Sequence, residues 1–116
     1  MRVFVYYNLH KKLWSVKSLE SLTKGLVIAH RKELVLRNVK PKVSEAGRQR
    51  VIRERKKNVH AGLVGEWDFD HDVVSFTGDK ITYNPYRYNT FVFADSEEPF
   101  EYADMAYLGN KEVHIL

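Results

Sequence analysis

The sequence predicts one α+β domain over residues 1–116, with a mainly antiparallel sheet that begins as a β-meander and one prominent basic helix at about 44–57. Three observations support this fold class. Short β-branched and aromatic runs alternate with turn residues along the chain. A helix start signal follows Pro41. A chain of 116 residues is also too short to close two separate hydrophobic cores.

The N-terminal third predicts four strands joined by short basic turns. The run "RVFVYY" at residues 2–7 has strand composition, and "NLHKK" at 8–12 is typical of a turn. Residues 13–19 alternate polar and apolar side chains, which predicts a hairpin with the first strand. Further strands are expected at 25–30 and 34–39. Consecutive strands with short turns form a β-meander.

The single helix is predicted after Pro41, which we expect to end the strand series. Ser44 is a favourable N-cap, and Glu45 places an acid in the first turn, where the helix dipole favours it. The helix is expected to run from about residue 45 to about 57, with Asn58 as its stop.

The second half predicts shorter strands and more loops. We expect a strand within 60–69 and a hairpin of 73–76 with 80–83 around the turn at 77–79. Residues 89–94 and 112–116 are also expected to form strands, whereas 101–109 fit no single assignment.

Charge is divided unequally between the two halves of the chain. Residues 1–60 contain 16 Lys/Arg and 4 Asp/Glu, a net of +12. Residues 61–116 contain 3 Lys/Arg and 11 Asp/Glu, a net of −8. Such asymmetry indicates either a charged partner outside the chain or neutralisation of one half by the other.

Several classes of protein are excluded by composition. The sequence has no cysteine, which excludes disulfides, thiolate metal sites and a cysteine nucleophile, and it favours a cytoplasmic location. No apolar run approaches the roughly 20 residues that span a bilayer, and the N-terminus lacks the pattern of a signal peptide. No phosphate loop, dinucleotide fingerprint or zinc protease motif is present.

Cations crowd the predicted helix, with 6 Lys/Arg between Arg48 and Lys57. On a helical wheel Arg50, Arg53 and Lys57 form one stripe, which suits contacts with phosphate oxygens. Arg48 and Arg55 fall instead near the thin apolar side of the helix, so each should find an acid, a carbonyl or a bound anion as partner, or should extend its charged end to water. The alternative is a helix face that only meets water or the acidic half of the chain.

A second group of candidates lies in "ITYNPYRYNTF", residues 81–91. Tyr86 and Tyr88 flank Arg87, and exposed tyrosines beside an arginine can stack on nucleobases. The alternative is that tyrosines at alternate positions of a strand cover the core. Both interpretations are open at the level of sequence.

Three acids, Asp68, Asp70 and Asp72, share one side of the extended pattern "EWDFDHD". Carboxylates in this arrangement can hold Mg²⁺ or Ca²⁺, but the sequence lacks the glycine that a calcium loop needs. We therefore predict no metal site and expect these acids to pair with the basic half. Natural partners would be Arg48 and Arg55.

His60 directly follows the basic segment. A histidine beside arginines can act as a general acid or base in RNA cleavage, with Tyr83 or Tyr86 as a second proton carrier. This predicts a small metal-independent ribonuclease as one alternative, while a histidine bonded to the backbone is the structural alternative.

The segments "MRVFVYYNLHKKLWSVKSLE" and "KVSEAGRQRVIRERKKNVHAGLVG", and more loosely "YNPYRYNTFV", resemble small, mostly uncharacterised accessory proteins of tailed bacteriophages of enteric and related bacteria. The resemblance implies a phage protein made in the bacterial cytoplasm. It also implies action on nucleic acid or on a host component, and it assigns no role to any residue.

These observations favour a binding module for nucleic acid or a phosphate-bearing ligand, with no cofactor and no membrane partner. The first alternative is an inhibitor or adaptor of a host protein, including a homo-oligomer formed through the oppositely charged halves. The ribonuclease is the second alternative. The predicted ligand contacts are Arg48, Arg50, Arg53, Arg55, Lys57, Tyr86, Arg87 and Tyr88.

Overall fold

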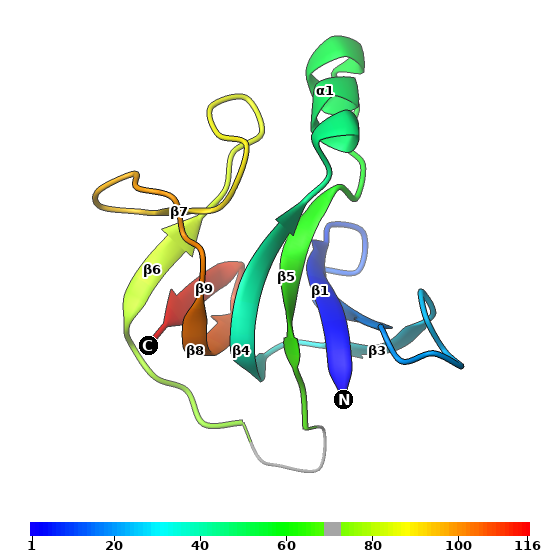
Figure 1. Cartoon of the computed structure of the whole chain (residues 1–116), viewed down its shortest axis with the longest axis vertical. Coiled ribbons are helices and arrows are strands. Elements are labelled where there is room, and N and C mark those ends of the chain that lie inside the picture. The colour runs from blue at the N-terminus through cyan, green and yellow to red at the C-terminus, as the bar shows by residue number, and fades with distance from the viewer. Residues whose placement is uncertain (69–72) are drawn as a thin grey trace.

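The computed structural model describes residues 1–68 and 73–116. Its strands form a single 9-stranded sheet in the order β3-β2-β1-β5-β4-β8-β9-β6-β7, and every neighbouring pair is antiparallel (Figure 1). One helix accompanies the sheet among the described residues, so the α+β prediction is confirmed. The elements are β1 (Arg2–Asn8), β2 (Leu13–Ser18), β3 (Val27–Arg31), β4 (Leu34–Val43), α1 (Glu45–Glu54), β5 (Ala61–Glu66), β6 (Asp79–Thr82), β7 (Val92–Phe93), β8 (Ala103–Gly109) and β9 (Glu112–Ile115).

The predicted meander holds for β1, β2 and β3 only. The fourth strand does not lie beside β3, because β5 pairs with the free edge of β1 and β4 pairs with β5. Val5 shows the arrangement, with Val16 opposite it on β2 and Leu63 opposite it on β5. The long β4–β5 hairpin is therefore joined to the meander through β5.

Pro41 does not end the fourth strand, contrary to the sequence prediction. β4 continues to Val43, and Pro41 lies opposite Leu63 of β5. The pairing of β4 with β8 stops at Val39, opposite Ala103. Pro41 thus lies where β4 has only one neighbouring strand, and a strand edge tolerates the missing N–H of proline.

The core covers one face of this sheet. Side chains at alternate positions of the central strands point into it, as the period of a strand requires. Tyr7 packs edge-on against Trp14, with ring centroids 5.2 Å apart. The fully buried members include Val3, Val5, Val16, Leu34, Leu36, Val39, Leu63, Phe100 and Leu108.

Helix α1 lies in the β4–β5 connection and projects beyond the ends of these strands (Figure 1). The Ser44 side chain accepts a hydrogen bond from the Gly47 backbone N–H, which confirms the predicted N-cap. The helix ends earlier than predicted. Arg55 takes the left-handed conformation at φ 55° and its N–H bonds to the Val51 carbonyl, so Lys57 and Asn58 lie outside the helix.

The C-terminal half departs from the predicted strand pattern in several places. Residues 73–76 form no strand, and β6 pairs with β9 and β7 instead of a hairpin partner before it. Residues 101–109, which fitted no assignment, contain β8. This segment is a strand because it pairs with β4 and β9. A short local sequence pattern does not contain that information.

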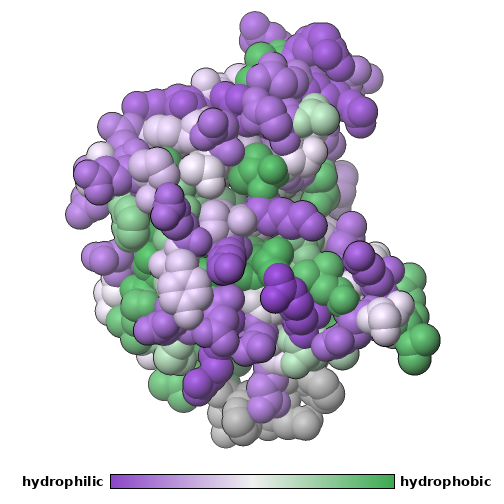
Figure 2. All heavy atoms as spheres, in the orientation of Figure 1, coloured by the Kyte–Doolittle hydropathy of each residue, from purple (hydrophilic) through white to green (hydrophobic). Residues whose placement is uncertain are grey.

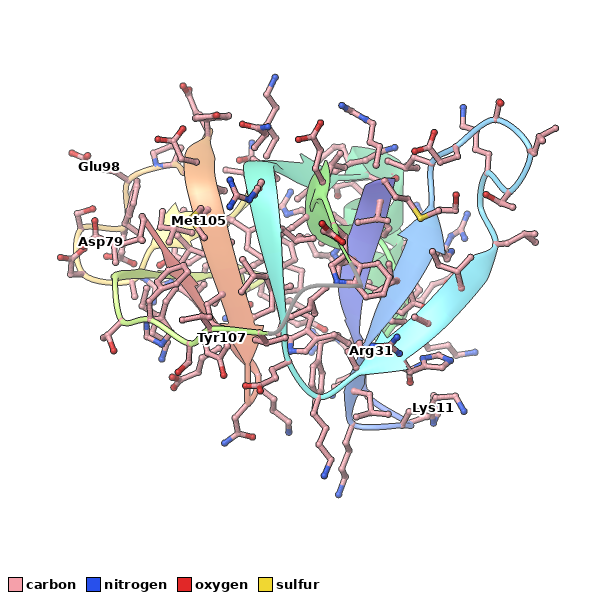
Figure 3. All side chains as sticks on the ribbon, turned by 90° about the horizontal axis from the view of Figure 1, so that it is seen from below. Lys11, Arg31, Asp79, Glu98, Met105 and Tyr107 are labelled. Atoms are coloured by element: carbon pink, nitrogen blue, oxygen red, sulfur yellow. The ribbon has the colours of Figure 1, made fainter. Side chains whose placement is uncertain are left out.

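Two basic and two acidic residues mark opposite sides of the molecule. Figure 3 places Lys11 and Arg31 on the side of β2 and β3, and Asp79 and Glu98 on the side of β6 and β7. In the described part of the chain, no helix is long and apolar enough to cross a membrane.

Candidate nucleic-acid interface

Arg48 joins the helix to the loop after β6. Its Nε–H donates to the backbone oxygens of Pro85 at 2.9 Å and Tyr88 at 2.8 Å, and its Nη1 pairs with Glu45 at 2.9 Å. Only 15% of the side chain is exposed. Arg48 therefore finds the partners that burial demands, but it finds Glu45 and two carbonyls instead of the expected Asp68. Its role in this arrangement is to hold the helix in place.

The remaining cations of the segment are exposed. We call Arg50, Arg53, Arg55, Lys56 and Lys57 the basic tip; all are exposed to solvent. Among the described residues, none of them forms an ion pair. Figure 2 shows mostly hydrophilic side chains around the projecting helix. The basic tip therefore carries positive charge that no described carboxylate of the chain neutralises directly.

The ion pairs that the structure describes do not connect the basic half to the acidic half. Arg48 pairs with Glu45 inside the first half, while Lys80 pairs with Glu112 inside the second. Arg87 and Glu97 form a further pair of the second half. In the described part of the acidic half, no carboxylate forms an ion pair with the basic tip.

Residues 85–87 form a turn and not a strand, so Tyr86 and Tyr88 do not alternate on one strand face. Arg87 pairs with Glu97 at 2.7 Å and its guanidinium lies 5.2 Å from the centre of the Tyr88 ring. The Tyr88 hydroxyl donates to the same Glu97 carboxylate, and this bond raises the pKa of Tyr88. Arg87 and Tyr88 are thus engaged with Glu97, whereas Tyr86 is 57% exposed.

His60 lies between the base of the helix and Tyr83. Its Nδ1 is 3.1 Å from the Asn58 backbone oxygen, and its Nε2 is 2.7 Å from the Tyr83 hydroxyl. A carbonyl can only accept, so Nδ1 carries a proton, and in the neutral imidazole the tyrosine hydroxyl donates to Nε2. Burial raises the pKa of Tyr83. Of the two tyrosines predicted beside His60, Tyr83 is the one in contact, and the bonds describe a brace between the helix and the sheet.

The acidic cluster of the sequence lies mostly outside the described residues. Asp70 and Asp72 belong to that omitted part, and Asp68 directly precedes it. Among the described residues, no group of three histidine, aspartate or glutamate side chains is placed to hold a metal ion.

An open groove of about 300 Å³ lies next to the segment that follows the basic tip. It is lined by Phe4 and Lys17 from the meander, Lys42 from β4, and Val59 and His60 from the return to β5. Sequence reasoning singled out His60 from this group and missed the other residues. The signal was the alternation in "RVFVYY", where buried Val3 and Val5 leave Phe4 and Tyr6 on the opposite face.

Lys56 was also missing from the predicted contacts, although it lies in the same charge run. The predicted stripe of Arg50, Arg53 and Lys57 assumed that the helix continues to Lys57, whereas the chain leaves the helix at Arg55. Beyond Arg55 helical spacing no longer determines which cations share a surface.

Comparison with known proteins places the chain in a phage setting. The profile of a family described as "Mycobacterium phage L5 gene 82 protein" matches residues 1–116. The "Gene 82 protein" of Mycobacterium phage L5 is 45% identical over 124 residues, covering 97% of this chain and 94% of that protein. No solved structure matches. The resemblance to small phage proteins is confirmed, although this relative comes from a mycobacterial phage and not an enteric one. The chain belongs to the family of the Mycobacterium phage L5 gene 82 protein.

Proposed function

We propose that this phage protein binds nucleic acid through the basic tip, in the cytoplasm of the infected bacterium. The observation that carries the proposal is the exposure of Arg50, Arg53, Arg55, Lys56 and Lys57 without an ion pair among the described residues. Guanidinium and ammonium groups on a projecting element attract phosphates and release their counterions. The contacts to the phosphate backbone make this affinity independent of base sequence.

The structure reduces the set of arginines that are free to contact phosphate. Arg48 is engaged with Glu45 and with the loop carbonyls, and Arg87 is engaged with Glu97. We therefore assign phosphate contact to the basic tip and a supporting role to Arg48. Tyr86, which is exposed beside Arg87, remains a proposed contact for a base.

Titration of labelled DNA and RNA at about 50 and 200 mM salt tests the proposal, because each phosphate contact adds about 0.9 to the slope of log K against log salt on duplex DNA. Arg50→Ala with Arg53→Ala should weaken binding and lower that slope by about 2. Arg50→Lys with Arg53→Lys should keep the slope, because lysine retains the charge.

Lys32→Ala with Lys111→Ala is the control for net charge, since both lysines are exposed and lie in turns away from the helix sequence. It should reduce affinity less than the change at the basic tip. Equal losses in the two double variants would show a general charge effect and no defined site. Absence of salt-sensitive binding by the unaltered protein would remove the proposal.

A protein contact is the second candidate function, and the β2–β3 connection favours it. Leu22 is 96% exposed and Leu26 is 58% exposed, next to the unpaired edge of β3. Exposed apolar side chains beside a free strand edge are typical of surfaces that meet another chain. Light scattering should then show association that Leu22→Ser with Leu26→Ser abolishes, whereas a monomer at all concentrations contradicts self-association.

A further inference from the structure

The face of the sheet opposite the core carries aromatic rings between lysines. Phe4 lies opposite Lys17 of β2 in the strand register, and the Phe4 and Tyr6 ring centroids are 6.1 Å apart. The Lys17 ammonium nitrogen is 5.5 Å from the centre of the Tyr6 ring. Both rings are partly exposed, because Val3 and Val5 occupy the core side of the same strand. Aromatic and cationic groups thus share one open surface.

Lysines also border the other side of these rings. Lys42 of β4 lies opposite Gly62 of β5, and β5 is the strand next to β1. Lys17 on β2 and Lys42 on β4 are therefore separated by three inter-strand distances, or about 14 Å. Both side chains line the same groove as Phe4. Lys17 and Lys42 thus lie on either side of the Phe4 ring.

Gly62 lets the Phe4 ring lie over the sheet. A Cβ atom on Gly62 would be 2.6 Å from the ring carbon Cζ of Phe4 and 2.4 Å from the Val5 backbone oxygen. Only a residue without a side chain leaves this space free. The ring is thereby supported on one side by β5 while it lines the groove on the other.

Part of the groove lining follows the basic tip closely in the sequence. Val59 and His60 line it, and only Asn58 separates them from Lys57 along the chain. The lining therefore begins two residues after the basic tip ends.

We infer that this groove binds single-stranded nucleic acid, with bases stacked on Phe4, which lines it, and on the neighbouring Tyr6, and with phosphates near Lys17 and Lys42. The inference rests on the proposed function of the basic tip and adds the class of ligand. Base stacking on aromatic side chains is independent of sequence and needs bases that are not already paired. A duplex keeps its bases stacked inside and meets only the cations.

An acidic peptide is the other occupant that the lysines would accept. It would pair with Lys17 and Lys42, but it would gain little from a flat ring surface beside them. Rings flanked by cations therefore favour the nucleic acid, which uses both kinds of group.

The experiment compares single strands of DNA and RNA, a DNA duplex and poly-glutamate on the full chain. Phe4→Leu retains an apolar side chain over Gly62 and removes the aromatic face. It should weaken single-strand binding about tenfold while duplex affinity is unchanged. Lys17→Gln with Lys42→Gln should weaken binding and lower its salt dependence, and Lys17→Arg with Lys42→Arg should restore it. Tyr102→Leu removes an exposed ring elsewhere and is the matched control.

The outcomes separate this inference from the proposed function. Unchanged single-strand affinity in Phe4→Leu, with circular dichroism showing an intact fold, overturns the stacking groove and leaves the basic tip standing. Equal competition by poly-glutamate in the unaltered protein and in Phe4→Leu also overturns it, because charge alone then explains binding. Failure of the unaltered protein to bind either nucleic acid form overturns both.

Discussion

Arg48 and Arg50 are two residues apart on α1 and have different surroundings. Arg48 is 15% exposed and holds Glu45 and the carbonyls of Pro85 and Tyr88. Arg50 is exposed and forms no ion pair within the described residues. Neighbouring cations on this short helix thus have different roles, because their side chains point in different directions. Arg48 supports the fold, whereas the other cations face outward. Counting the cations in the sequence therefore overestimates how many of them a ligand can contact.

The largest expected effect is on the free energy of unfolding, and it tests whether Arg48 and Arg50 differ in this way. Arg48→Ala leaves two backbone oxygens of the loop without their donor and should lower the free energy of unfolding by about 2 kcal/mol, since hydrogen bonds to charged groups contribute about 1.5–3 kcal/mol. Urea unfolding measures it. Arg50→Ala is the matched control and should change stability by less than about 0.5 kcal/mol. Equal losses would show that the two arginines do not differ as described.

A smaller effect is expected at Arg55, where one substitution should change stability and nucleic-acid binding in opposite directions. Arg55 is held at φ 55°, where glycine is favoured, so Arg55→Gly should raise the free energy of unfolding by about 1 kcal/mol. The same change removes a cation of the basic tip and should weaken nucleic-acid binding. Thermal and urea unfolding, with a binding titration, measure the two effects.

Lys56→Gly is the control, because Lys56 does not have a positive φ. It should also weaken binding but bring no gain in stability. A gain of equal size in both variants would mean that the left-handed conformation of Arg55 is not the cause.

The smallest effect concerns the partner of Arg48. The hydrogen bond from Gln49 lowers the pKa of Glu45 below its ordinary value of 4.5, and Arg48 lowers it further. A carboxyl with a lowered pKa in the folded state stabilises the fold above its unfolded pKa and loses that contribution as pH falls through the folded pKa. Glu45→Gln should therefore be less stable than the unaltered protein at pH 7. The difference should shrink as the pH falls below about 4.5 and disappear once the pH is below the lowered pKa of Glu45 in the folded protein.

Glu54→Gln tests whether this pH dependence is specific. Glu54 lies in the last turn of the same helix and forms no ion pair within the described residues. Its removal should not destabilise the protein at pH 7, because a negative charge at a helix C-terminus is unfavourable. A pH-dependent loss as large as that of Glu45→Gln would contradict the assignment of the Arg48 pair.

The sequence predicted correctly those features that depend on interactions between residues close together in the chain. Ser44 and Glu45 start the helix where predicted, because the cap and the dipole act within one turn. The alternation of Phe4 and Tyr6 with buried valines likewise fixes two faces of β1. The division of charge between the halves is also a property of the sequence alone, and the basic half contains the segment with most cations.

Tertiary structure decided which cations are available and what lies beside them. The carbonyls that engage Arg48 belong to Pro85 and Tyr88, 37 and 40 residues later in the chain, and no local pattern connects them. The insertion of β5 between β1 and β4 brings Phe4, Lys17 and Lys42 to one groove. Sequence spacing determines the direction of a side chain within its element, whereas strand order and loop docking determine its neighbours, because those contacts join distant segments.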